Sequence, residues 1–398
     1  MAKDLKDLKA LLKAALQLCL ASLRRRIGPL LNPTGDIYVY VGRDGNVDEF
    51  KKRLKHFVPG IEGRYKLLER YSVRALLSPA PVVVLDGRWG ERVNSVLGLH
   101  NLDYKKCADD AWNWFRLAAF LDRKELDLHI KKSEAVFREV SNRLKKDKSR
   151  AYIFGTGSSL ERAAELDWSN GIRIVSNTIV KDEALWRHID PHFIVAGDAL
   201  YHFGHTPFAV TFRADLRLRL AESSAYFVYP AIFDPVVRRE FSDMQSRLIP
   251  IPFGSSRVPI CDLLQRFELP LTGNVLNLLL LPIATTLAKD IFLWGFDGKA
   301  PGDKMFWKNS ERHFYQELVP QLEAAHPAFF AFQLPKDKPD SYVNSVHGDI
   351  LDAHLSRAEA EGYRFILLHK SWTKTLQKRY SDPAQCSVCS VGGGNAHG

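Results

Sequence analysis

The sequence contains few cysteines, and its five are scattered over 398 residues. Sparse cysteines of this kind exclude a disulfide framework and are typical of a chain kept in a reducing compartment. The closest pair, Cys386 and Cys389, lies in a tail rich in glycine, serine and asparagine. A structural zinc site needs four ligands, and the chain has no second pair, so we expect no metal there.

Long apolar runs and paired acidic motifs are also lacking. No segment reaches the roughly 20 apolar residues of a membrane span, and the longest candidate, residues 275–287, predicts a buried helix. The chain contains no Asp-x-Asp motif, the pair of carboxylates with which many enzymes hold a divalent metal. This absence favours a metal-independent reaction, and we expect neither a metal nor another cofactor.

Positive charge is abundant, with a formal net charge of +10, which indicates an anionic partner. Over residues 1–33, leucines recur at helical spacing with lysines opposite, followed by three arginines. One interpretation is a helix that holds residues 1–31 on the anionic inner face of the cytoplasmic membrane; the other is an ordinary amphipathic helix packed on the protein or a partner. No small-residue cleavage site follows, so we expect a cytoplasmic protein.

Strand-like and helix-like segments alternate along the chain. Residues 36–42 and 81–87 are apolar runs with a helical pattern between them, which predicts a small α/β unit. The same alternation continues from Ala151 to the run at 290–298. Because fully buried parallel strands give such runs, we expect an α/β protein whose main domain is a Rossmann-like parallel sheet with helices on both faces.

These patterns divide the chain into four predicted parts. The boundary between the two α/β domains is expected at the basic run 145–150. The predicted parts are an amphipathic basic helix over 1–33, a small N-terminal α/β domain with connecting helices over 34–147, the Rossmann-like domain over 148–376 and a disordered tail over 377–398.

A glycine-rich turn follows the first strand of the main domain, in the segment AYIFGTGSSL. Gly155 and Gly157 allow the backbone to approach a ligand closely, while Ser158 or Ser159 can cap the helix that follows. The free N–H groups of a helix start favour an anion. The turn therefore predicts a nucleotide site, although its spacing matches neither the dinucleotide fingerprint nor a Walker loop.

Polar residues also end several other predicted strands. Ligands of open parallel sheets bind at the carboxyl ends of the strands. A single polar residue there is usually a cap or turn residue, whereas several together indicate a site. The polar strand ends are Thr156, Ser158, Asn177, Asp198 and Asp297.

The succession YIFGTGSSL, IVSNTI, FIVAGDAL and LPLTGNVLNLLLLPIATTLAKDIFLWGFD resembles the bacterial sialyltransferases of glycosyltransferase family 42 and the related motility-accessory glycosyltransferases. Those enzymes carry a Gly-x-Gly-Pro-Ser-Leu turn, an Asn after the second strand, a Thr-Ser-Gly helix start and a Gly-Ile/Phe-Asp strand end. The resemblance covers residues 151–372 and implies a GT-A-like variant of the Rossmann fold. It implies inverting, metal-independent transfer of an acidic 2-keto sugar, sialic-acid-like or Kdo-like, from a CMP-activated donor to a surface glycan or glycolipid.

The resemblance also implies roles for the matched residues. The nucleotide phosphate and ribose would be lined by Gly155, Gly157, Ser158 and Ser159. The donor sugar or phosphate would contact Asn177, the donor carboxylate would lie near Thr272 and Gly273, and the cytidine side would face Asp297. The family's base is a histidine that enters a helix followed by a strand, and SVHGDILDAHLSRAEAEGYRFILL has that succession with His347. A histidine suits deprotonation of an acceptor hydroxyl, and His313 is the rival candidate.

The sequence departs from the family pattern at several positions. Ser158 replaces the proline of the turn, and Asp198 stands in place of a second asparagine. The tyrosines that stabilise the leaving phosphate have no match, and Lys299 or Lys304 could supply that charge. The related pterin diphosphokinases share the turn and would use ATP and magnesium. A noncatalytic nucleic-acid-binding protein is a third alternative, but the dispersed charge matches no such motif, so we expect no nucleic-acid partner.

Overall fold

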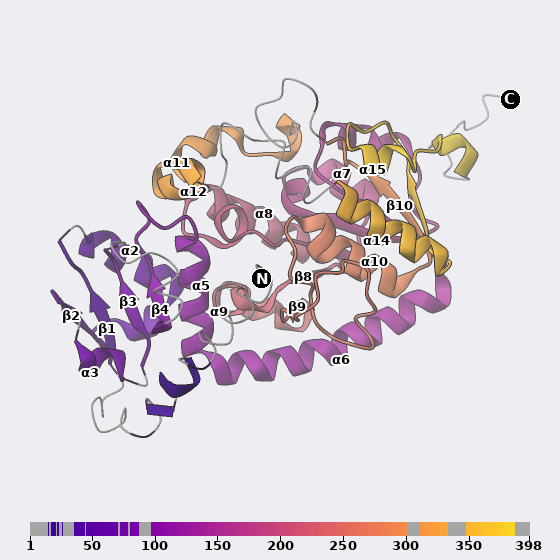
Figure 1. The fold of residues 1–398 in the computed structure, drawn as a ribbon. Coiled ribbons are helices and arrows are strands. Elements are labelled where there is room, and N and C mark those ends of the chain that lie inside the picture. The colour runs from indigo at the N-terminus through magenta and orange to yellow at the C-terminus, as the bar shows by residue number, and fades with distance from the viewer. Residues whose placement is uncertain are drawn as a thin grey trace, which may run out of the picture. The chain divides into compact units, whose positions relative to one another are not determined.

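The structure is a computed structural model, and it describes most of the chain between residues 36 and 386. The described residues are 15, 17–20, 22, 23, 26, 36–43, 45–70, 72–78, 80–86, 97–298, 300, 310–332 and 348–386. They belong to two compact units (Figure 1). The first comprises Met1–Asp122 and Glu323–Leu334, and the second comprises Arg123–Leu322 and Pro335–Gly398.

The first unit is built on a four-stranded parallel sheet with the order β2-β1-β3-β4. Its strands are β1 (Ile37–Tyr40), β2 (Tyr65–Leu68), β3 (Val82–Val84) and β4 (Leu99–Asn101). Its helices are α2 (Val47–Phe57), η1 (Pro59–Ile61), α3 (Val73–Leu76), α5 (Asp110–Leu121) and α12 (Pro327–Phe332). The predicted small α/β unit is confirmed, with the two apolar runs as the central strands. The edge strands β2 and β4 are as short as the central ones but include Lys66, His100 and Asn101, so they form no continuous apolar run.

Both faces of this sheet carry packed side chains. One face buries a cluster that contains Tyr38, Tyr40, Val82, Val84 and Leu99. In α2, Phe50 and Phe57 stack on Trp114 of α5, with ring centroids 5.5 and 5.1 Å apart. Asn46 caps α2 by accepting the N–H of Glu49 at 2.9 Å. The cap and the aromatic stack together hold α2, the helix that follows β1, in place.

The second unit is built on a seven-stranded parallel sheet with the order β11-β10-β5-β6-β7-β8-β9. Its strands are β5 (Arg150–Phe154), β6 (Ile172–Ser176), β7 (Phe193–Val195), β8 (Tyr226–Pro230), β9 (Leu248–Ile251), β10 (Asp290–Trp294) and β11 (Arg364–Leu367). All six strand pairings are parallel. The predicted Rossmann-like parallel sheet is thereby confirmed.

Helices precede β5, connect the strands and follow β11. They are α6 (Arg123–Asp147), η2 (Ser158–Glu165), η3 (Asn177–Lys181), α7 (Glu183–Ile189), η4 (Ala199–Phe203), α8 (Pro207–Ala221), η5 (Ala231–Phe233), α9 (Asp234–Glu240), η6 (Ser242–Arg247), η7 (Leu276–Leu280), α10 (Leu281–Leu287), η8 (Glu311–His313), η9 (Gln316–Leu318), α11 (Val319–Ala325), α14 (Asp349–Ala360), α15 (Lys374–Gln377) and η10 (Pro383–Cys386). The buried helix expected over 275–287 is confirmed as η7 and α10.

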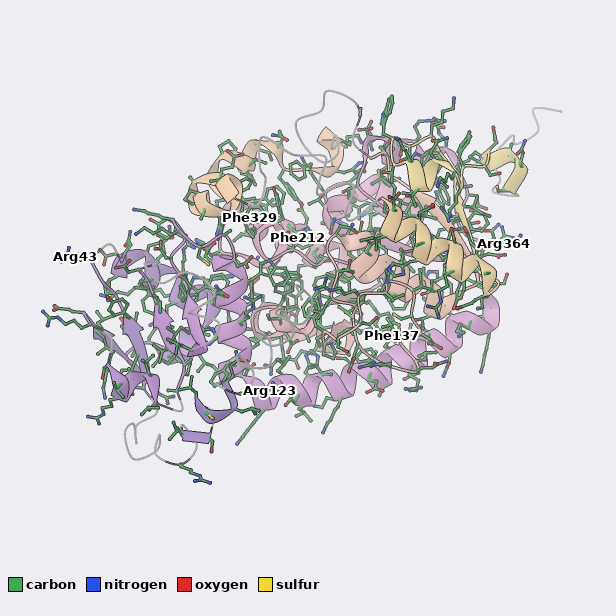
Figure 2. All side chains as sticks on the ribbon, in the orientation of Figure 1. Arg43, Arg123, Phe137, Phe212, Phe329 and Arg364 are labelled. Carbon is green, nitrogen blue, oxygen red and sulfur yellow. The ribbon has the colours of Figure 1, made fainter. Side chains whose placement is uncertain are left out.

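Successive residues of the strands point to opposite faces of the sheet. On one face, Ile153 of β5 and its neighbours share a core with α6, α10 and α14, which contains Phe137. On the other face, Tyr152 and Phe154 pack edge-on against Trp168, at 5.1 and 4.9 Å between ring centroids. Figure 2 shows Phe137 on α6 and Phe212 on α8 among the side chains of this unit. The sheet is therefore buried on both faces, as its continuous apolar runs predict.

The ends of the chain and the domain boundary differ in part from the prediction. The units divide between Asp122 and Arg123 rather than at 147/148, because α6 packs along β9 and shares the core of the second unit. Residues 377–386, predicted to begin a disordered tail, are ordered, since Arg379 pairs with Glu359 at 2.6 Å and with Asp352 at 2.8 Å.

The predicted N-terminal helix over 1–33 lies largely outside the described residues. The eight positions that are described between 15 and 26 are all helical. Within the described part of the chain, no helix combines the length and the apolar character needed to cross a membrane.

Candidate functional site

The order of the strands locates a candidate site at the carboxyl edge of the large sheet. From β5 the chain adds β6 to β9 on one side and then returns to place β10 on the other side of β5. The loops that leave β5 and β10 therefore start side by side, and the chain continues from them in opposite directions along the sheet. In open parallel sheets, this switch point is where a crevice forms and where ligands bind.

Two glycines let the loops after β5 and β10 approach each other closely. The N–H of Gly157 donates to the carbonyl of Gly295 at 2.9 Å. Gly295 has a φ of +80°, and a Cβ there would lie 2.2 Å from the carbonyl oxygen of Gly155. A Cβ on Gly155 would lie 2.5 Å from the carbonyl oxygen of Gly295. Side chains at these positions would separate the loops.

The carboxylate of Asp297 is held at the start of η2. Ser159 donates its backbone N–H to Asp297 at 3.2 Å and its hydroxyl to Oδ2 at 2.9 Å. Ser158 Oγ lies 3.5 Å from Oδ1, and a Cβ on Gly157 would lie 2.1 Å from Oδ2. The structure thus brings together the predicted residues Gly157, Ser158, Ser159 and Asp297.

This arrangement changes what the glycine turn can bind. A helix start attracts an anion through its N–H groups, but the N–H of Ser159 already has the carboxylate of Asp297 as its acceptor. A phosphate at that N–H would have to displace Asp297 and would be repelled by it. A carboxylate is an acceptor, so hydroxyl or amino groups of a ligand suit this position better than a phosphate does.

The loop after β11 completes the site and was not predicted. Ser371 Oγ donates to the carbonyl oxygens of Phe296 at 2.7 Å and Asp297 at 3.1 Å. The N–H of Trp372 donates to the carbonyl of Asp297 at 2.7 Å. This loop directly follows a predicted strand, and that position was the available signal. The sequence does not show that the polar residues after this strand meet the glycine turn, because the turn lies more than 200 residues earlier.

His369 fixes the loops after β10 and β11 to each other. Its Nε2 accepts the N–H of Phe296 at 3.1 Å, and its Nδ1 lies 2.9 Å from the carbonyl of Lys370. This pattern requires a neutral ring with the proton on Nδ1. Burial lowers the pKa of His369, opposed by the nearby carboxylate of Asp297, so the neutral form is maintained.

Asn177 lies at the carboxyl end of β6, the strand beside β5. Its φ is +52°, a left-handed conformation that Asn adopts more readily than most residues. Its side-chain Oδ1 is buried and has no hydrogen-bond partner among the described residues. An unsatisfied buried acceptor in a strained backbone is typical of a functional position. Thr156, which is also buried, lies in the turn after β5.

The remaining predicted ligand residues are Asp198, Thr272 and Gly273. Asp198 lies three residues after the end of β7, which is two strands from β5, and its carboxylate caps η4 by accepting the N–H groups of Leu200 and Tyr201 at 2.8 and 3.0 Å. Thr272 and Gly273 lie in the turn before η7. The hydrogen bonds described for these three residues do not join them to the glycine turn.

The predicted base, His347, lies outside the described residues, as do Lys299 and Lys304. The rival, His313, is buried, and its Nε2 lies 3.1 Å from Asp182 Oδ2. Burial lowers the pKa of His313, while Asp182 opposes the shift. Its Nδ1 is buried and has no hydrogen-bond partner among the residues that the structure describes. In this structure His313 has no open path to a substrate, because its side chain is fully covered.

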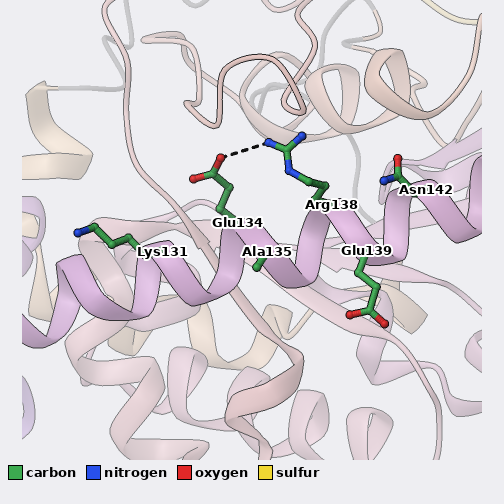
Figure 3. Close-up of a pocket in the computed structure, with 6 residues that line it drawn as sticks. All are labelled: Lys131, Glu134, Ala135, Arg138, Glu139 and Asn142. Atoms are coloured by element: carbon green, nitrogen blue, oxygen red, sulfur yellow. Dashed lines mark hydrogen bonds and ion pairs between the residues drawn. The ribbon is translucent and has the colours of Figure 1, made fainter.

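No metal cluster marks another site in the described part of the chain, and a second pocket, in the first unit, is lined among others by Arg53, Leu85, Leu102 and Asp103. Among the described residues, no three His, Cys, Asp or Glu side chains are grouped so that they could hold a metal ion. A hollow on α6 is lined by Lys131, Glu134, Ala135, Arg138, Glu139 and Asn142 (Figure 3). All six come from one helix, and an ion pair of 3.3 Å joins Glu134 to Arg138, so this hollow is a helix surface away from the strand ends.

Comparison of the chain with known protein families, with curated proteins and with solved structures gave no match.

Proposed function

We propose that the chain is an inverting, metal-independent glycosyltransferase. The donor would be a CMP-activated acidic 2-keto sugar, sialic-acid-like or Kdo-like. The observation that carries this proposal is the carboxylate of Asp297 held against Ser159 at the β5/β10 switch point. A nucleotide presents ribose hydroxyls and, in cytidine, a base amino group, and a carboxylate acceptor suits these donors.

The other residues of the site support the same ligand. The Oδ1 of Asn177, which is buried and has no partner in the described part of the chain, is a second acceptor on the strand beside β5, and it would receive a hydroxyl or amino group of the donor. The acceptor hydroxyl would lose its proton to His347, the role that the sequence resemblance implies, since a histidine titrates near neutral pH. Inversion follows when the acceptor oxygen attacks the anomeric carbon as the C–O bond to CMP breaks.

The acceptor would be a surface glycan or a glycolipid. The formal charge of +10 favours an anionic acceptor or an anionic membrane surface, bound through residues 1–31. This part of the proposal predicts that the full chain sediments with vesicles containing anionic lipid and that high salt releases it.

The test is release of CMP from CMP-activated acidic sugars by the purified chain, with a chelator present. We expect turnover with the chelator, and we expect His347→Ala to lose turnover but to keep CMP binding. His354→Ala, on α14, is the matched control and should keep both. Turnover that requires magnesium and ATP would replace this proposal with a pterin diphosphokinase-like activity. Undiminished turnover in His347→Ala would remove that histidine as the base.

A further inference from the structure

One aromatic side chain at the switch point has no structural role in the core. Trp372 has 61 % of its surface exposed. The other tryptophans that the structure describes are buried or half-buried: Trp112, Trp114, Trp168, Trp186 and Trp294. Leaving an indole in water forgoes the free energy that its burial would give, so its position needs a reason other than folding.

The backbone beneath Trp372 is held rigidly to the candidate site. Its N–H donates to the backbone carbonyl of Asp297 at 2.7 Å. The residue that carries the indole is therefore hydrogen-bonded to the residue whose carboxylate contacts the glycine turn. Ser371 Oγ accepts the N–H of Thr373 at 3.0 Å, and the N–H of Ser371 donates to Gln377 at 2.7 Å. Gly298, at φ +74°, leaves room for this loop, since a Cβ there would lie 2.5 Å from Thr373 Oγ1.

Two cations flank the indole along the chain. Lys370 and Lys374 lie two residues before and two residues after Trp372, and both are exposed. An exposed aromatic ring between cations is the chemistry with which proteins bind a nucleotide: the ring stacks on the base, and the ammonium groups attract the phosphate. The same loop therefore offers the positive charge that a phosphate needs. The glycine turn does not, because the carboxylate of Asp297 already occupies it.

We propose that Trp372 is the stacking surface for the nucleobase of the donor and that Lys370 and Lys374 attract its phosphate. This inference rests on the proposed nucleotide donor and assigns its base to the loop after β11. With the base on Trp372, the ribose hydroxyls lie toward Asp297, which the backbone of Trp372 contacts. The loop after β11 then sets the affinity for the nucleotide, and the glycine turn sets its orientation.

The experiment compares CMP with ribose 5-phosphate, which has the same sugar phosphate without a base. Dissociation constants are measured by calorimetry, and quenching of tryptophan fluorescence is measured in parallel. We expect Trp372→Ala to weaken CMP binding about 5- to 100-fold and to leave ribose 5-phosphate unaffected. We expect Trp372→Phe to keep CMP affinity within about threefold, because its ring still stacks, but to lose most of the quenching.

The control is Leu218→Ala, which removes an apolar side chain of similar exposure (57 %) from α8. It should change neither affinity nor quenching. Equal CMP affinity in the wild type and in Trp372→Ala would overturn the inference and leave the proposed function standing. An equal loss for CMP and ribose 5-phosphate would also overturn it, because the indole would then act on the loop and not on the base. Binding of ATP instead of CMP, lost in Trp372→Ala, would overturn the CMP donor but support the stacking role.

Discussion

Ser159 gives both its backbone N–H and its hydroxyl to one carboxylate, that of Asp297 on the neighbouring strand end. The first unit repeats this relationship at its own switch point, between β1 and β3. There the N–H of Arg43 donates to Asp86 at 3.2 Å, and a Cβ on Gly42 would lie 2.1 Å from Asp86 Oδ2. In both units an aspartate joins two neighbouring loops from which the chain continues in opposite directions along the sheet.

This repetition allows the structural and binding roles of Asp297 to be separated. We expect Asp297→Ala and Asp86→Ala each to lower the free energy of unfolding by about 1–3 kcal/mol, because each leaves a loop N–H without its acceptor. Only Asp297→Ala should abolish stabilisation by CMP. Calorimetric unfolding with and without CMP measures both effects. If Asp297→Ala bound CMP as the wild type does, its carboxylate would be a structural tie only.

Gly157 tests the close approach of the turn to Asp297. An added Cβ would lie 2.1 Å from Oδ2 and would displace the carboxylate from Ser159. Gly157→Ala should therefore destabilise the second unit by about 1–3 kcal/mol and weaken nucleotide binding. Gly60→Ala is the control, since a Cβ there meets nothing within 4 Å. Equal behaviour of the two variants would contradict the described geometry.

A buried charge cluster in the first unit predicts a large stability effect. The carboxylate of Asp110 lies 2.7 Å from Arg53 and 3.0 Å from His326, and all three side chains are buried. Asp110→Asn leaves the Arg53 guanidinium paired with the partly exposed carboxylate of Glu49 at 2.8 Å, so we expect a loss of about 1–3 kcal/mol in urea unfolding. Asp127→Asn breaks the exposed pair with Arg123 and should cost less than about 1 kcal/mol. A loss below 1 kcal/mol for Asp110→Asn would show that the cluster is not formed.

Buried histidines predict acid sensitivity. Burial lowers the pKa of His202 and of His192 to about 3, while their pKa in the unfolded chain is about 6.5. Between these values the unfolded chain binds more protons than the folded one. The unfolding free energy is therefore complete above pH 6.5 and falls with decreasing pH, by up to about 1.4 kcal/mol per unit for each histidine. The unfolding free energy in urea should differ less between pH 5 and pH 7 for His202→Asn than for the wild type. An equal difference for the two proteins would contradict burial of His202 in its neutral form.

The fold was more predictable than the site. Continuous apolar runs such as 151–154 and 291–294 identify buried parallel strands, because both faces of such strands must be covered. The glycine turn and Asp297 were predicted as site residues for their places at strand ends. Their mutual hydrogen bonds were not predictable, because they depend on β10 returning to the side of β5 opposite β6. An apolar run indicates a strand but not which strand pairs with it in the sheet. For the same reason Trp372 was missed, although it follows a predicted strand.

The most direct measurement is a thermal-unfolding panel of the full chain with CMP, CDP, UDP, GDP and ATP, each with and without magnesium. A ligand that binds the folded state raises its stability, by about 2.7 kcal/mol at a concentration 100 times its dissociation constant. We predict selective stabilisation by CMP, equal with and without magnesium and lost in Asp297→Ala. Stabilisation by ATP only, and only with magnesium, would contradict the CMP-sugar donor, and stabilisation by none of the five would contradict a nucleotide site at the β5/β10 switch point.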